Sequence, residues 1–311
     1  MHFMSAKEGD SRVVDFNEKV AVITGGAGGI GLALAKRLAD EGAKIMLADI
    51  SEDALAKAVH GLSAMGATAS SVKTDVTSNE DWSRLVNETI DRYGRVDFLF
   101  NNAGVYLVKS FDYLTETDWN WLMDVNFFGP LKGVRAFMPV MEKQATGGHI
   151  VFTASIASCA PKPNTSTYEA SKAALLRLAE CCFLEAKDAG KENMKFAVIM
   201  PSFVVTDLFD CDVHRPIEYC NTEEIKSPAD LQAIATRKGA DLTASLGAIE
   251  PAVAVARIID QLKKGYFYIY THRTFTKEVI LEQTARLLKG YDPPMHLGQF
   301  MVNYYQRKKL R

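Results

Sequence analysis

Short runs of apolar and β-branched residues alternate with helical segments along most of the 311-residue chain. The helical segments, such as GGIGLALAKRLADEG and NEDWSRLVNETIDRYG, repeat apolar residues at intervals of three and four. Alternating strands and helices favour a parallel sheet that is covered by helices on both faces. The runs predicted to be strands begin at Lys19, Lys44, Ser70, Val96, Gly148, Lys195 and Tyr266.

Seven strands in this arrangement predict one doubly wound α/β domain with a seven-stranded parallel sheet over residues 19–271. Residues 1–18 are then an N-terminal extension. Residues 272–311 are a C-terminal extension, with a helix from about Lys277 to Lys289 and an aromatic tail. Residues 202–250 contain no predicted strand and only one short predicted helical segment. Such a long irregular stretch in a compact domain is usually functional. We interpret it as a lid over the substrate; the alternative is an insertion without function.

Composition excludes several classes of function. The net charge of −2 gives no basic surface for DNA, RNA or an anionic membrane. No apolar run approaches the ~20 residues that cross a bilayer, and the N-terminal residues do not resemble a signal peptide. We therefore expect neither a nucleic-acid partner nor a membrane partner.

The cysteines and histidines are scattered. The six histidines form no metal motif, and no cysteine belongs to a C-x-x-C pair. We predict no metal site, no disulfide framework and a reducing, cytoplasmic location. The five cysteines are Cys159, Cys181, Cys182, Cys211 and Cys220, of which the adjacent pair is interpreted as packing or interface residues.

A glycine-rich turn, TGGAGGIG from Thr24 to Gly31, follows the first predicted strand and precedes a helix. Glycines there let the backbone approach a pyrophosphate, which the helix N-terminus attracts. Gly25, Gly29 and Gly31 are spaced G-x-x-x-G-x-G, which departs from the pattern G-x-G-x-x-G. The position of the turn predicts a dinucleotide site.

Asp49 ends the second predicted strand. A carboxylate there can accept hydrogen bonds from ribose hydroxyls and repels a 2′-phosphate. No Arg or Lys lies within the glycine turn or directly after Asp49. NAD is therefore favoured over NADP, with the alternative that Asp49 only caps the next helix.

The pentapeptide YEASK places Tyr168 and Lys172 one helical turn apart. With the preceding pieces it resembles the short-chain dehydrogenase/reductase family, in its single-domain branch, from Lys19 to Tyr270. The resemblance implies a Rossmann fold, NAD as cofactor and interconversion of an alcohol and a carbonyl. The matching pieces are TGGAGGIG, Asp49, Asp75–Val76, NNAG at 101–104, Asn126, TAS ending at Ser155, YEASK and PSFVVTD from Pro201.

The resemblance also implies catalytic roles. Tyr168 is the proton donor in reduction and the acceptor in oxidation. Because a free phenol has a pKa near ~10, the ammonium of Lys172 is needed to favour the phenolate. Ser155 hydrogen-bonds the substrate oxygen, and Asn126 holds a water in a proton relay. Taken singly, Ser155 is more typical of a cap and Asn126 of a structural polar residue.

The resemblance implies the cofactor residues in the same way. Ser202 replaces the glycine that is usual after Pro201, so the resemblance does not predict the geometry of the loop there. The implied cofactor residues are Gly25, Gly29, Ile30, Gly31, Asp49, Ile50, Asp75, Val76, Asn102, Ala103, Gly104, Tyr168, Lys172, Pro201, Val204 and Thr206. The resemblance further favours a homodimer or homotetramer, joined through helices around residues 105–140 and 168–188.

The predicted lid mixes aromatic and aliphatic residues with few clustered charges, which suits a small-molecule substrate that is a bulky, mainly apolar alcohol or ketone. A hydroxysteroid is the first candidate and a bulky aryl alcohol of the lignin type the next. A non-catalytic dinucleotide-binding regulator and an epimerase or lyase with transient NAD use remain as alternatives. The apolar lid residues are Phe203, Leu208, Phe209, Ile217, Tyr219, Leu231, Ile234, Leu242 and Leu246.

Overall fold

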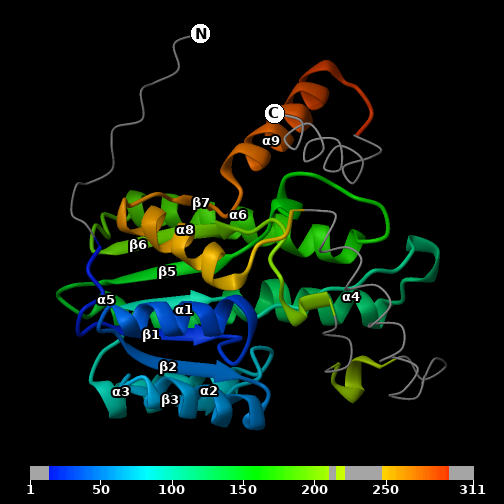
Figure 1. Ribbon diagram of the computed structural model, residues 1–311. Helices are drawn as coiled ribbons and strands as arrows, with labels where there is room; N and C mark the ends of the chain where they lie inside the picture. Colours follow the sequence, from blue (N-terminus) through cyan, green and yellow to red (C-terminus); the bar gives the residue numbers. More distant parts are fainter. Residues whose placement is uncertain (1–13, 210–214, 221–246, 294–311) are drawn as a thin grey trace.

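The computed structural model describes residues 14–209, 215–220 and 247–293. In these residues seven strands form one parallel sheet in the order β3-β2-β1-β4-β5-β6-β7 (Figure 1). Both the fold class and the seven predicted strands are confirmed. The strands are β1 (Val20–Thr24), β2 (Lys44–Asp49), β3 (Ala69–Lys73), β4 (Phe98–Asn101), β5 (Gly148–Thr153), β6 (Met194–Met200) and β7 (Tyr268–Tyr270).

Helices join the strands and cover the sheet (Figure 1). The α-helices are α1 (Gly29–Asp40), α2 (Glu52–Ala64), α3 (Asn79–Tyr93), α4 (Glu116–Met123), α5 (Gly129–Glu142), α6 (Ser166–Asp188), α8 (Pro251–Lys263) and α9 (Arg273–Lys289). The 3-10 helices are η1 (Phe111–Tyr113), η3 (Ile156–Ser158) and η5 (Ile217–Tyr219), and η2 (Asp124–Phe128) is a π-helix between α4 and α5.

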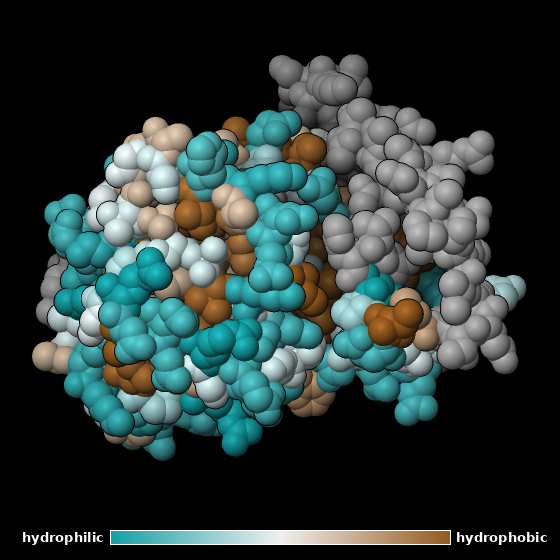
Figure 2. All heavy atoms as spheres, turned by 90° about the horizontal axis from the view of Figure 1, so that it is seen from below, coloured by the Kyte–Doolittle hydropathy of each residue, from teal (hydrophilic) through white to brown (hydrophobic). Residues whose placement is uncertain are grey.

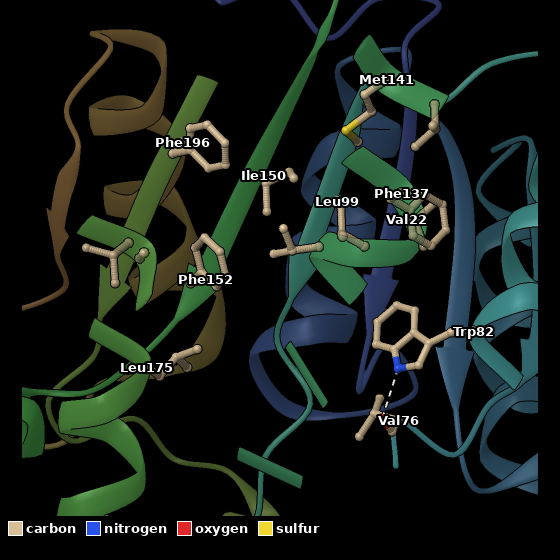
Figure 3. Packing of buried hydrophobic residues seen from close by; sticks show 14 of the residues in the cluster. Val22, Val76, Trp82, Leu99, Phe137, Met141, Ile150, Phe152, Leu175 and Phe196 are labelled. Carbon is tan, nitrogen blue, oxygen red and sulfur yellow. Dashed lines mark hydrogen bonds between the residues drawn. The ribbon is translucent and has the colours of Figure 1, made fainter. Parts of the chain in front are cut away.

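Two hydrophobic cores hold these layers together. The first packs α3, α5 and α6 on the sheet, and in it the ring of Trp82 meets that of Phe137 edge-on, with centroids 6.1 Å apart. Trp82 also donates a hydrogen bond from Nε1 to the Val76 carbonyl at 2.9 Å (Figure 3). The second core packs α1, α2 and α8 on the other face. Because both faces are covered, β1 and β5 are buried along their whole length, which explains their continuous apolar runs.

The two extensions differ from their predicted bounds in detail. Phe16, which the sequence assigned to the N-terminal extension, is 1% exposed and packs in the second core. Helix α9 begins at Arg273, four residues before the predicted start. It projects from the body of the domain (Figure 1) and is buried at its beginning, where Phe275 and Val279 pack.

The predicted lid falls largely outside the described residues, and so does the short helical segment expected within it. Its two ends meet in an isolated bridge between Val204 and Ile249. Within the described part of the chain, no helix is both long and apolar enough to cross a membrane. On the face seen in Figure 2, hydrophobic residues are scattered in small groups among hydrophilic ones.

His149 gives the fold an acid-sensitive position. It lies in β5, is 6% exposed, and its ring packs 5.7 Å from that of Phe98. Burial, with a contribution from the charge of Lys195, lowers the pKa of His149 from 6.5 to about 3. Below pH ~6.5 the imidazole of His149 therefore binds a proton in the unfolded chain but stays neutral in the folded chain. The free energy of unfolding falls as the pH drops through this range.

We expect His149→Leu to remove this dependence. Between pH 7.5 and pH 5, the free energy of unfolding of the parent protein should fall by roughly 2 kcal/mol more than that of the variant. Urea unfolding at the two pH values measures the difference. Replacing His60, which is exposed on α2, is the control. Equal pH dependence of parent and His149→Leu would contradict the prediction.

Candidate active site

A cavity of about 480 Å³ opens at the carboxyl ends of the parallel strands, where α/β sheets bind ligands. Of the predicted site residues, all line this cavity except Gly31 and Asn126. Those on the wall are Gly25, Gly29, Ile30, Asp49, Ile50, Asp75, Val76, Asn102, Ala103, Gly104, Ser155, Tyr168, Lys172, Pro201, Val204 and Thr206.

The glycine turn between β1 and α1 has no room for a side chain at Gly25 or Gly31. A Cβ on Gly31 would lie 2.1 Å from the Gly25 carbonyl oxygen, and one on Gly25 would lie 2.9 Å from the Ala103 Cα. Gly25 and Gly29 also have positive φ, at 60° and 49°. Gly28, Gly29 and Ile30 at the start of α1 line the cavity, and the free N–H groups of a helix start fit the pyrophosphate of a dinucleotide.

Asp49 is positioned on the same side of the cavity. Its Oδ2 accepts a hydrogen bond from Ala27 N and its Oδ1 accepts one from Ser51 N, both at 3.2 Å. The cap of α2 is Ser51, whose side chain accepts from Ala54 N. Asp49 is therefore not the helix cap, and each of its oxygens keeps lone pairs for ribose hydroxyls.

Asn102 connects the ends of three strands. Its Nδ2 donates to the Thr24 carbonyl at 3.0 Å, and its Oδ1 accepts from Thr153 Oγ1 at 3.2 Å. Thr24 Oγ1 accepts from the backbone N–H groups of Asn102 and Ala103, at 2.9 and 3.0 Å. These bonds fix the glycine turn relative to the end of β5.

Helix α6 presents Tyr168 and Lys172 to the cavity. Lys172 is 3% exposed; its Nζ donates to the Thr153 carbonyl at 2.9 Å and lies 5.8 Å from the centre of the Tyr168 ring. Burial lowers the pKa of Lys172 to about 7. Both of its protonation states are thus populated at neutral pH, which suits a group that passes a proton to a phenolate.

Ser155 follows β5 and is the N-cap of η3. Its Oγ accepts a hydrogen bond from Ala157 N at 3.1 Å, so the capping interpretation holds for one lone pair. The hydroxyl hydrogen is still available for donation to a substrate oxygen. A cap and a catalytic donor are therefore compatible in this residue.

Asn126 lies in the π-helix η2 and is completely buried. Its Oδ1 accepts from Val105 N at 2.8 Å, and its Nδ2 donates to the Val105 carbonyl at 2.9 Å and to Ser171 Oγ at 3.1 Å. Protein groups take both N–H donors and one oxygen lone pair of this amide, so its visible role is to clamp the loop after NNAG. The water relay stays a prediction.

The far end of the cavity is aromatic; the sequence analysis predicted Phe209 and Tyr219 there and missed Tyr106 and Trp121. The Tyr106 ring meets those of Tyr168 and Phe209 edge-on, with centroids 4.7 and 5.1 Å apart. Trp121 of α4 and Tyr219 of η5 complete this part of the wall. Tyr219 OH donates to Asp124 Oδ2 at 2.9 Å, which ties η5 to the π-helix.

A buried ion pair anchors the described part of the predicted lid. Arg215 donates to the carboxylate of Asp118, whose side chain is 0% exposed, and its guanidinium lies 4.5 Å from the Trp121 ring centre. Burial acts to raise the pKa of Asp118, but hydrogen bonds from Thr115 and Arg215 lower it to about 2. The carboxylate therefore stays charged and holds Arg215 against α4.

Other chemistry finds little support among the described residues. No group of three or more His, Cys, Asp or Glu side chains there is placed to hold a metal ion. The described cysteines are free thiols, and Cys211 lies outside the described residues. Burial raises the pKa of both Cys159 and Cys182 to about 11, so these two thiols are not activated for redox chemistry.

The doubly wound sheet, the glycine turn and the cavity that contains Ser155, Tyr168 and Lys172 define an oxidoreductase of the short-chain type. The family model described as short chain dehydrogenase matches residues 19–214, and the chain belongs to this family.

Individual relatives extend the similarity to nearly the whole chain. The CLA biosynthesis dehydrogenase/reductase of Lactiplantibacillus plantarum is 32% identical over 91% of this chain and 98% of its own length. A short-chain dehydrogenase/reductase from Burkholderia phymatum, solved in complex with NAD, is 32% identical with a TM-score of 0.81, covering 91% of this chain and 99% of that one. The C alpha-dehydrogenase of Sphingobium is 29% identical over 71% of this chain and 72% of its own length.

The glycine turn gives a test with a matched control. Gly31→Ala places a Cβ against backbone and should destabilise the fold by at least about 2 kcal/mol and weaken dinucleotide binding. Gly28→Ala meets nothing within 4 Å and should leave stability within about 0.5 kcal/mol of the parent. Urea unfolding and calorimetric titration with NADH measure both effects. Similar behaviour of the two variants would show that the turn is not sterically closed.

Proposed function

We propose that this protein is an NAD(H)-dependent oxidoreductase that interconverts a bulky, mainly apolar secondary alcohol and its ketone. The observation that carries the proposal is the single cavity wall that contains Ser155, Tyr168 and Lys172 beside the glycine turn. The Burkholderia relative solved with NAD supports the same cofactor here. A homodimer or homotetramer and a cytoplasmic location stay predictions.

The residues divide the reaction between them. When bound, the nicotinamide supplies or accepts the hydride. In reduction, Ser155 donates a hydrogen bond to the substrate carbonyl oxygen, and Tyr168 gives that oxygen its proton. Lys172 then returns a proton to the phenolate, and in oxidation each transfer is reversed. The positive charge of Lys172 favours the phenolate in both directions.

The shape and lining of the cavity support the substrate class. Its far wall is formed by Tyr106, Trp121, Ile156, Phe209 and Tyr219, which suit an apolar ring system. A hydroxysteroid is the first candidate and a bulky aryl alcohol the second. Both curated relatives are named as dehydrogenases, so the similarity supports the reaction class and not one substrate. The joint presence of Tyr168 and Lys172 favours an enzyme over a regulator.

Asp49 should determine the choice of cofactor. Asp49→Asn keeps one acceptor oxygen but removes the negative charge that opposes a 2′-phosphate. We expect the ratio of kcat/KM for NAD to that for NADP to fall at least tenfold, or about 1.4 kcal/mol, with kcat for NAD little changed. Steady-state kinetics with both cofactors measure the ratio. An unchanged ratio would show that another group excludes the phosphate.

Tyr168→Phe tests the proposed function itself. Oxidation of NADH at 340 nm, followed with a panel of ketosteroids and aryl ketones, should fall at least about 100-fold because the proton donor is lost. Calorimetry should show unchanged NADH binding. Tyr113→Phe is the control, since Tyr113 is 70% exposed in η1. Tight NADH binding without turnover of any ketone by the parent protein would favour the regulator instead.

A further inference from the structure

A charged pair lies at the apolar end of the cavity and has no part in the reaction described above. Lys162 belongs to the loop between η3 and α6, and Glu169 follows Tyr168 in the first turn of α6. Both residues line the cavity together with Tyr106. Their side chains are 25% and 9% exposed, so the two charges are largely withdrawn from water.

The two charges are only loosely joined. Lys162 Nζ is 4.0 Å from Glu169 Oε1, at the outer limit of an ion pair. Oε1 accepts from Thr165 Oγ1 at 2.9 Å, whereas Oε2 is buried with no hydrogen-bond partner among the described residues. Lys162 Nζ donates to Tyr106 OH at 3.3 Å. An ammonium has three N–H donors, so this set leaves Lys162 with capacity for a further acceptor.

Burial disfavours both charges. It lowers the pKa of Lys162, which Glu169 raises in part, and it raises the pKa of Glu169 to about 7. A desolvated ammonium beside a carboxylate that takes up a proton near neutral pH is an unbalanced positive site. Such a site is stabilised by an anionic oxygen more than by a neutral one.

The ring of Tyr106 lies between Lys162 and Tyr168, the residue at the reacting end of the cavity. Its Nζ lies 5.5 Å from the centre of the Tyr106 ring, and that ring lies 4.7 Å from the ring of Tyr168. A substrate can therefore reach both Tyr168 and Lys162 by extending across a single tyrosine ring.

We propose that Lys162 is a specificity-determining residue that binds a carboxylate on the substrate, remote from the carbon that is oxidised or reduced. The substrate is then an acid with an apolar body, such as a keto or hydroxy acid built on a ring system. This inference rests on the proposed function and narrows its substrate class. Glu169 limits the affinity, since its negative charge opposes a second carboxylate, and it leaves the ketone chemistry at Tyr168 untouched.

A pair of probes that differ only in charge tests the inference. 4-Acetylbenzoate and its methyl ester are compared by kcat/KM with NADH and, independently of turnover, by calorimetric Kd with the NAD-loaded protein, which has no hydride to give to a ketone. We expect the carboxylate to be favoured at least tenfold. Lys162→Met should abolish this preference by lowering kcat/KM for the carboxylate at least tenfold more than for the ester, and Lys57→Met, exposed on α2, should preserve it. Glu169→Gln should strengthen binding of the carboxylate and not of the ester.

The outcomes separate this inference from the proposed function. Turnover of the ester with no preference for the carboxylate would overturn the inference and leave the dehydrogenase intact. Equal losses for both probes in Lys162→Met would also overturn it, because they would show a structural role. Lys162-dependent binding of the carboxylate without turnover of either ketone would support the inference and count against the enzyme. Weaker carboxylate binding in Glu169→Gln would show that Glu169 only holds Lys162 in place.

Discussion

The hydrogen bonds of Asn102 at the ends of β1, β4 and β5 are the constraint on which the rest of the site depends. Parallel strands end at the cavity with backbone groups that no further ladder partner satisfies, and such groups must be paired when they are buried. Asn102 pairs with the Thr24 carbonyl on one side and with Thr153 Oγ1 on the other. The carbonyl of that same Thr153 accepts from Lys172 Nζ. A single chain of bonds thus sets the distance between the glycine turn and Lys172.

Much of the fold was predictable because its signals are local. The five central strands, β1, β2, β4, β5 and β6, are largely buried and give nearly continuous apolar runs, and a closed turn needs glycine at fixed positions. The start of α9 was not predictable in this way. Only Phe275, Thr276 and Val279 of that helix are buried, while leucines such as Leu287 and Leu288 are 75% and 81% exposed. A helix that projects from the domain has no single apolar face, so periodicity could not locate its first turn.

The parts of the site that the sequence did not predict are those made by distant pairs. Tyr168 and Lys172 are four residues apart on one helix, and their spacing is visible in the sequence. Arg215 and Asp118 are separated by 97 positions, and Asn126 and Val105 by 21. No spacing rule marks such pairs, because the fold alone brings them together. The amide of Asn126 is an example. Its hydrogen-bond partners, the Val105 backbone and the Ser171 hydroxyl, could not be inferred from the residues next to Asn126 in the sequence.

Two lysines in one cavity show how partners decide the role of a side chain. Lys172 is buried, and its Nζ donates a hydrogen bond to a backbone carbonyl. Because no carboxylate offsets the burial, the pKa of Lys172 falls to about 7. It can therefore exchange a proton under the conditions in which the enzyme works. Lys162 is only partly buried, and Glu169 offsets part of the desolvation that lowers its pKa. A lysine that stays charged is poor at proton transfer and good at binding an anion. We therefore propose that the same residue type exchanges a proton at one end of the cavity and binds an anion at the other.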